Sequence, residues 1–139
     1  NTTAFSIQTT PTSGTTPNYQ FIQPKVTTTN ATVTTLLSVA ISTSTTTMIE
    51  AYVVARRTGG TAGTAEDSAV FRLFSGYKNT AGTVTAIASA SPVKEAIKDQ
   101  AAWDVTYVIS TTNVNIRVTG AANNNISWIG TVKLLTVNT

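Results

Sequence analysis

Two arginines, Arg56 and Arg57, lead into a glycine-rich stretch, "RRTGGTAGTA", at residues 56–65. Such a stretch could hold a phosphate group. A phosphate loop of the Walker type, however, follows the pattern G-x-x-x-x-G-K-[ST], and this stretch contains no lysine. No helical periodicity follows Gly63, so no helix N-terminus would face a bound anion. We therefore expect a mobile connection between two strands rather than a phosphate site.

Carboxylates are the other groups that could do chemistry, because the chain contains no histidine and no cysteine. A Ser-His-Asp triad, a thiol nucleophile and a thiolate zinc site are excluded. Glu66 and Asp67 are neighbours, so they face apart in an extended chain, and Glu95 and Asp99 share a face only in a helix. We expect no catalytic residue and no cofactor. We assign no metal, although oxygen ligands near Glu66, Asp67 or the "ANNN" segment leave a calcium site open.

The composition favours an all-β protein with a single core. Of the 139 residues, 41% are hydrophobic and only 11% are charged, against about 25% charged in ordinary soluble domains. Threonine replaces much of the missing charge, and its β-branched side chain fits a pleated surface while its hydroxyl keeps an exposed face wet. A chain of this length can bury one sizeable core.

The positive charge of the chain is dispersed. The net charge is +3, but the basic residues are spread along the sequence, and Arg56 and Arg57, the adjacent pair, point to opposite faces of an extended strand. A nucleic-acid surface would need a basic cluster with interleaved aromatic residues. No apolar run is long enough to span a bilayer. We therefore expect neither nucleic acid nor membrane as a partner.

Short segments with a period of two predict the strands. Clear examples are "TMIEAYVVAR" and "SAVFRLFSGYK" on either side of the glycine-rich stretch, the hairpin from Trp103 to Thr119, and "ISWIGTVKLL" near the end. In "VTTLLSVAI" the alternation places Val33, Thr35, Leu37, Val39 and Ile41 on one face, and "KEAIKDQ" could form one helical turn. We expect residues 33–139 to form a jelly-roll-like antiparallel β-sandwich of about eight strands.

Residues 1–32 form a separate segment, which holds three of the four prolines in a background of threonine and serine. Such a segment buries too little apolar surface to fold alone. We expect an extended arm, or equally a flexible linker. Tyr19 and Phe21 share one side of a short strand that would dock on this domain or on a neighbouring subunit, and docking of Phe5 and Ile7 would make the arm an anchor.

Two long blocks carry a resemblance to a known class of proteins. They are "EAYVVARRTGGTAGTAEDSAVFRLFSGYKNTAGTVT" and "DQAAWDVTYVISTTNVNIRVTGAANNNISWIGTVKLL", which cover most of residues 50–135. The "ARRTGGTAGTA" loop, the "DQAAWD" entry and the "IRVTGAANNNISW" ending resemble a β-module in structural proteins of tailed bacteriophages, notably at the ends of tail-fibre-like proteins. The resemblance implies a surface-exposed, non-enzymatic virion module that forms a homotrimer. Apolar residues on a second strand face, namely Val70, Phe74, Ile129 and Leu135, favour self-association independently.

Three functions remain open. The first is a decoration or cement protein on the capsid, whose arm lies on the major capsid protein and whose β-domain projects as a knob. The second is the distal domain of a tail fibre or spike, which presents residues 58–67 and 120–125 to a host glycan or protein. The third is a carbohydrate-active enzyme or glycan-binding module, in which Tyr52, Tyr77 or Trp128 would stack on sugar rings if they were exposed. Whatever the function, we expect Arg56 and Arg57 to anchor a loop or to link subunits through carboxylates such as Glu66 and Asp67.

Overall fold

The computed structural model describes residues 2–8 and 18–138, and for residues 2–8 and 18 it describes the backbone only. The described residues form ten strands and one short 3₁₀ helix, η1 (Ile87–Ser89). The all-β class predicted from the sequence is confirmed. The strands are β1 (Thr2–Gln8), β2 (Asn18–Thr28), β3 (Thr34–Ala40), β4 (Thr45–Gly60), β5 (Ser68–Thr80), β6 (Thr83–Ala86), β7 (Val93–Lys98), β8 (Asp104–Ser110), β9 (Asn113–Thr119) and β10 (Asn124–Asn138).

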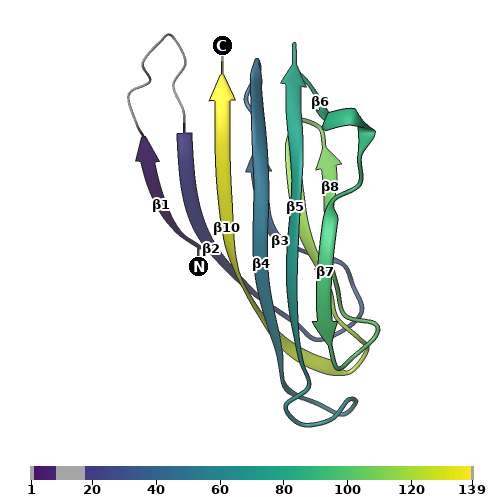
Figure 1. The fold of residues 1–139 in the computed structure, drawn as a ribbon. Helices are drawn as coiled ribbons and strands as arrows, with labels where there is room; N and C mark the ends of the chain where they lie inside the picture. The colour runs from purple at the N-terminus through teal and green to yellow at the C-terminus, as the bar shows by residue number, and fades with distance from the viewer. Residues whose placement is uncertain (1, 9–17, 139) are drawn as a thin grey trace.

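The strands make two layers of unequal size (Figure 1). The larger sheet has the order β1-β2-β10-β4-β5-β6, and β7 pairs with β5 beside β6. The smaller sheet has the order β3-β9-β8 and covers one face of the larger sheet. All strand pairs are antiparallel, so the expected antiparallel architecture is confirmed. The opposite face of the larger sheet, which we call the outer face, is left without a covering layer among the described residues.

The core lies between the two sheets and is built by strict alternation along the strands. In β4 the odd-numbered positions from Thr45 to Ala55 are buried, and in β10 Ile126, Trp128 and Val132 are fully buried. The rings of Trp103 and Trp128 lie 5.9 Å apart at the centre of the core. Two large fully buried aromatic side chains contribute several kcal/mol to stability, at about 1.5–3 kcal/mol for each large apolar side chain.

Two local predictions are wrong. A register shift between Thr35 and Leu37 changes the phase of β3, so Leu36 is buried at 7% exposure and Leu37 is only half-buried. A bulge of this kind cannot be read from alternation alone. The segment "KEAIKDQ" contains no helical turn, because its first residues belong to β7 and pair with β5 from Val93 to Lys98. Sheet pairing overrides the weak local helix propensity there.

Strand β2 is an integral part of the larger sheet. It pairs with β10 from Thr28↔Ile126 to Asn18↔Thr136. Its inner side contributes Pro24 and Thr28, which are buried, to the sandwich. Residues 18–28 of the predicted arm therefore dock on the same chain. The backbone of β1 pairs with β2, while the side chains of Phe5 and Ile7 lie outside the described part of the structure.

Candidate functional site on the outer face of the larger sheet

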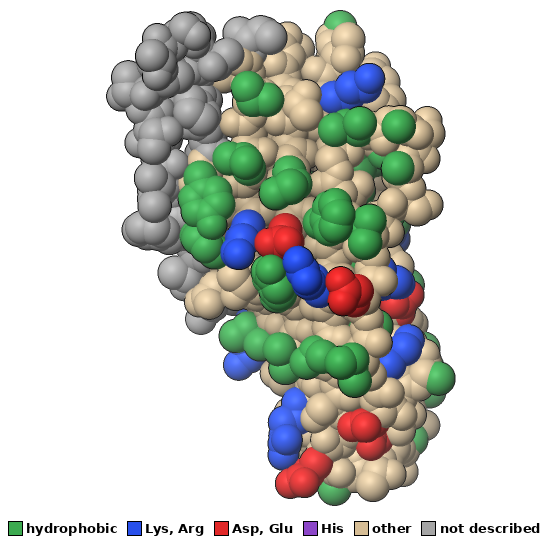
Figure 2. Space-filling model, in the orientation of Figure 1, with side chains coloured by type: hydrophobic (Ala, Val, Ile, Leu, Met, Phe, Trp, Pro, Cys, Tyr) green, Lys and Arg blue, Asp and Glu red, His purple; other side chains and the backbone are tan. Residues whose placement is uncertain are grey.

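The outer face carries many exposed apolar side chains (Figure 2). Side chains on the even-numbered positions of β4 and β5 and on the odd-numbered positions of β10 point away from the smaller sheet. A row of solvated threonines and charges would be the ordinary composition of such a face. Large apolar residues stand there instead, each 37–78% exposed: Met48, Tyr52, Val54, Val70, Phe74, Ile87, Val93, Ile97, Ile129, Leu135 and Val137.

The sheet register aligns these side chains into bands that cross the strands. Ile129 pairs with Val54, Val54 with Val70, and Val70 with Ile97. We call these four residues the first apolar band, and it is the lower green band in Figure 2. Cross-strand neighbours on one face lie about 4.5–5.5 Å apart, so the band is a continuous apolar strip from β10 to β7.

A second apolar band lies further along the strands. Leu135 pairs with both Tyr19 and Met48, and Met48 pairs with Gly76, over which the side chain of Ile87 lies. The absence of a side chain at Gly76 makes room for Ile87. One row closer to the first band lie Phe21, Phe74 and Val93, and the ring of Phe21 meets that of Tyr19 edge-on at 5.0 Å. The second apolar band comprises these seven residues and Gly76.

A diagonal line of alternating charges separates the two bands (Figure 2). Lys133 Nζ lies 3.6 Å from Glu50 Oε1, Arg72 lies 3.9 Å from Glu50 Oε2, and Arg72 lies 3.8 Å from Glu95 Oε1. Tyr52 lies among these charges, and its hydroxyl donates a 3.1 Å hydrogen bond to Glu50. Lys133 and Arg72 make cation–π contacts with its ring, at 5.1 and 5.9 Å from the ring centroid. The charges hold one another in place across four strands.

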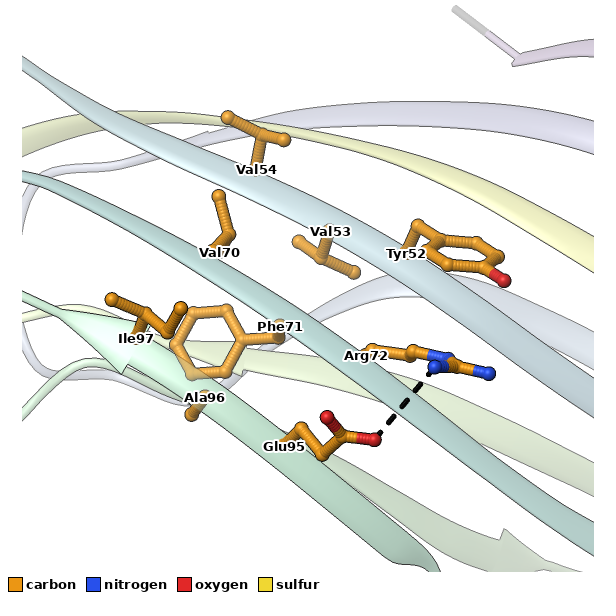
Figure 3. Close-up of a pocket in the computed structure, with 9 residues that line it drawn as sticks. All are labelled: Tyr52, Val53, Val54, Val70, Phe71, Arg72, Glu95, Ala96 and Ile97. Carbon is orange, nitrogen blue, oxygen red and sulfur yellow. Dashed lines mark ion pairs between the residues drawn. The ribbon is translucent and has the colours of Figure 1, made fainter.

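A shallow hollow of about 590 Å³ lies between the charge line and the first apolar band (Figure 3). Val54, Val70 and Ile97 line one side, and the Arg72–Glu95 ion pair lies at the other. Tyr52 also lines the hollow, with its hydroxyl hydrogen-bonded to Glu50, and the one carboxylate in the lining, that of Glu95, is paired with Arg72. Its chemistry suits the binding of an apolar side chain next to a polar group.

All six carboxylates of the chain are engaged by neighbouring groups. Besides Glu50 and Glu95, which belong to the charge line, these are Glu66 with Arg56, Asp67 with Thr64 N and Gln100, Asp99 with Ser68 N, and Asp104 with Lys94. Asp67 is the most deeply buried of these carboxylates, whereas Glu66 and Glu95 are mostly exposed. Within the described residues no group of three or more acidic side chains could hold a metal ion, and no described helix is long and apolar enough to cross a membrane.

Arg56 and Arg57 take different roles at the glycine-rich stretch. Arg57 is half-buried, and its guanidinium donates to the carbonyls of Ala62 and Gly60 and to Asn124 Oδ1 at 2.7–3.0 Å. Arg56 forms a 3.3 Å ion pair with Glu66 in which both side chains are mostly exposed. The stretch connects β4 and β5, as expected, and Arg57 holds it against the start of β10; its mobility stays a prediction.

The glycines of this stretch serve the same packing. Gly60 has φ +96°, and a Cβ there would collide with the carbonyl oxygen of Asn123. Gly63 has φ +75° and lies directly against the side chain of Asn124. Only glycine adopts these angles without strain and allows such close approach. The segments 58–67 and 120–125 thus form one loop cluster, at the lower end of the sandwich in Figure 1.

The aromatic residues considered for sugar stacking are distributed unevenly. Trp128 and Tyr77 are 0% and 3% exposed, so a stacking role for these two is excluded, while Tyr52 is 37% exposed on the outer face. Burial raises the pKa of the Tyr77 phenol and, more strongly, that of Tyr107, whose pKa the neighbouring Tyr77 raises further. Both are core residues that remain protonated at neutral pH.

The sequence identified part of this face. Tyr19, Phe21, Phe74, Ile129 and Leu135 lie together on it, while Arg56 and Arg57 belong to the loop cluster. Met48, Val54, Val93, Ile97 and the charge line were not recognised from the sequence. In "TMIEAYVVAR" Val54 alternates with the buried residues Val53 and Ala55, and an apolar residue at such a position is the signal that could have revealed the first apolar band.

Comparisons with known proteins give structural similarities only. No protein-family model and no curated protein matches the sequence. The chain is similar to part of the tailspike protein gp49 from Acinetobacter baumannii bacteriophage Fri1, a capsular polysaccharide depolymerase, with a TM-score of 0.39 and 11% identity over 94% of this chain. It is also similar to part of the tailspike protein of Acinetobacter baumannii phage AM24, with a TM-score of 0.41 and 9% identity over 86% of this chain. The chain spans 19% and 26% of the length of those two proteins.

Proposed function

We propose that the chain is a non-enzymatic structural module of a tailed-phage virion, in which it acts as a decoration or cement protein on the capsid surface. The observation that carries this proposal is the outer face, where two apolar bands and a charge line cross the larger sheet. Exposed apolar patches of this extent mark surfaces that bind other proteins. The resemblance of residues 50–135 to a virion β-module supports the same assignment.

A structural role also agrees with how the carboxylates are used. General acid–base catalysis needs a carboxylate free to exchange a proton with a substrate. Here Asp67 is buried and accepts two hydrogen bonds, and Glu50 accepts a hydrogen bond from Tyr52 and contacts two cations. The binding surface is therefore better developed than any reaction site in the described residues.

Self-association through the outer face is part of the proposal, with a homotrimer as the assembled form. Phe74, Ile129 and Leu135 would be covered by copies of the same chain, which removes their exposed apolar surface from water. The N-terminal segment, with Phe5 and Ile7, would contact the major capsid protein. In this arrangement the sandwich projects from the shell as a knob.

The loop cluster favours a second candidate function. Segments 58–67 and 120–125 lie together at one end of the sandwich, where backbone and side-chain hydrogen bonds pair them. Loops positioned by a rigid scaffold are common sites of recognition. The chain would then be the distal domain of a tail fibre or spike that presents this end to a host glycan or protein.

Copy number distinguishes these functions. Quantitative mass spectrometry of purified particles, with the major capsid protein as the reference, measures how many copies each virion carries. Decoration of the shell requires on the order of hundreds of copies, whereas a tail location gives a small number. Absence of the chain from particles would contradict both virion functions.

A further inference from the structure

The two halves of the outer face differ in chemistry. The half formed by β5 and β7 presents Val93, Glu95 and Ile97 on alternate positions of β7, so an acid stands between two aliphatic side chains. The half formed by β2 and β10 presents basic and aromatic groups, with Lys133 between the ring of Phe21 and that of Tyr52. The outer row of β7 therefore carries an acid between aliphatic side chains, whereas β10 carries a base that lies beside two aromatic rings.

Strand β7 is shaped to present this row. All six of its residues are exposed, and its described pairing is with β5 on one side. Its two lysines turn toward the smaller sheet, where Lys94 Nζ contacts Asp104 at 2.7 Å and Lys98 Nζ contacts the carbonyl of Trp103 at 2.8 Å. With both lysines bound there, Glu95 and Ile97 remain on the outer face, 71% and 78% exposed.

We propose that β7 of one copy packs on β10 of a second copy, with Glu95 facing Lys133 of that copy. The spacing along the two strands agrees on one side of the charges. In β7 the outer row reads Ile97, Glu95, Val93, and in β10 it reads Ile129, Thr131, Lys133, Leu135. Val93 and Leu135 each stand two residues from the charge, and on the other side Thr131 lies between Lys133 and Ile129. Aliphatic side chains then meet the ends of the apolar bands, and opposite charges meet between them. Complementary charges of this kind fix the register of an interface.

This contact joins unlike surfaces, so it is heterologous and repeats from copy to copy. Heterologous contacts close into rings when the rotation permits. The homotrimer of the proposed function would be such a ring, and the inference rests on that self-association. The inference specifies the strands that meet, β7 and β10, and the charges that pair, Glu95 and Lys133.

Charge reversal tests the pairing, because Glu95 and Lys133 do not contact each other within one chain. They stand on β7 and β10, with β5 and β4 between them, which at about 4.8 Å per strand separates them by about 14 Å. Glu50 and Arg72 nevertheless link them in the charge line, so urea denaturation of the single and double variants must first show that their effects on the free energy of unfolding are additive. Any restoration of assembly in the double variant then reports a contact between copies.

Sedimentation equilibrium of the purified chain at micromolar concentrations is the measurement. We expect the parent chain to be a trimer, and Glu95→Lys and Lys133→Glu each to raise the dissociation constant at least tenfold, about the effect of one close charge pair. The double variant should recover most of the lost affinity. Ile97→Ser, at a mostly exposed position that does not support the core, should also weaken assembly.

Glu66→Lys is the matched control, since it makes the same change on a side chain that is 78% exposed and lies in the loop cluster. Glu66→Lys should leave the mass of the assembled trimer in sedimentation equilibrium the same as for the parent chain. Circular dichroism should show that all variants are folded. Additive effects in the double variant, or a monomeric parent chain, would overturn the proposed contact. A dimer would also overturn it, because a two-fold pair does not form a head-to-tail ring. The copy number in particles is independent of these outcomes, so failure of this inference is distinguishable from failure of the virion function.

Discussion

Thr28 shows how one hydroxyl ties the N-terminal region to the core. It is 4% exposed, and its Oγ1 accepts a 2.9 Å hydrogen bond from Nε1 of Trp128, which is fully buried. By contrast, Nε1 of Trp103 is buried without a hydrogen-bond partner in the described structure. The core therefore already contains one unsatisfied indole N–H, and it satisfies the second through Thr28.

Replacing Thr28 with valine keeps the shape and removes the acceptor. We expect Thr28→Val to lower the free energy of unfolding by about 1–3 kcal/mol, because a buried indole N–H is left without a partner. Urea denaturation followed by tryptophan fluorescence measures the change. Thr27→Val is the matched control, since Thr27 is exposed on the outer side of β2, and it should have little effect. Equal stabilities for the two variants would contradict a structural role for this hydrogen bond.

At the scale of the elements, the guanidinium of Arg57 anchors the glycine-rich connection, together with hydrogen bonds involving Thr58, Ala62 and Asp67. Arg57→Met removes the donors to Ala62, Gly60 and Asn124 while retaining the aliphatic part of the side chain. We expect a loss of about 1–3 kcal/mol, since two or more hydrogen bonds to a charged group disappear. Arg56→Met should cost less than about 1 kcal/mol, the usual range for an exposed ion pair.

Thermal unfolding measures both losses, and hydrogen exchange locates them. In Arg57→Met the amides of residues 61–67 should exchange faster, while those at the centre of β4 keep their protection. In Arg56→Met the exchange of residues 61–67 should change little. If the two variants behave alike, Arg57 is not the anchor of the loop cluster.

The elements also show what the sequence can and cannot predict. Strands β4, β5, β8, β9 and β10 follow from alternation, because each has a buried and a more exposed face over most of its length, although β8 ends with two exposed residues. The bulge near Leu36 and strand β7 do not follow, since both depend on pairing with distant strands. The same limit applies to the outer face. Phe74 and Ile129 are visible as second-face apolar residues, but the register that aligns Ile129 with Ile97 across β4 and β5 is a tertiary property.

For the whole molecule, the contact between the two sheets controls how stability depends on pH. Tyr107 belongs to the smaller sheet, and its hydroxyl donates a 3.1 Å hydrogen bond to the carbonyl of Leu73 in the larger sheet. Its ring lies 6.4 Å from that of Tyr77. Burial raises the pKa of Tyr107 above its ordinary value of 10.0, and the neighbouring Tyr77 raises it further. The folded protein therefore keeps this proton at a pH where the unfolded chain releases it.

This difference predicts a loss of stability in alkali. Below pH 10 the folded and the unfolded protein both hold the Tyr107 proton, so stability does not depend on pH through this group. Above pH 10 the unfolded chain ionises first, and the free energy of unfolding falls by about 1.4 kcal/mol per pH unit for each such tyrosine. In Tyr107→Phe the loss of the hydrogen bond lowers the free energy of unfolding by about 0.5–1.5 kcal/mol at neutral pH. The variant has no phenol at this position, so its stability does not fall above pH 10 through this group. Urea denaturation between pH 7 and pH 11 should therefore show the two stability curves converging above pH 10. A constant gap across that range would mean that Tyr107 ionises as readily in the folded protein as in the unfolded chain, and that the interface between the sheets admits water.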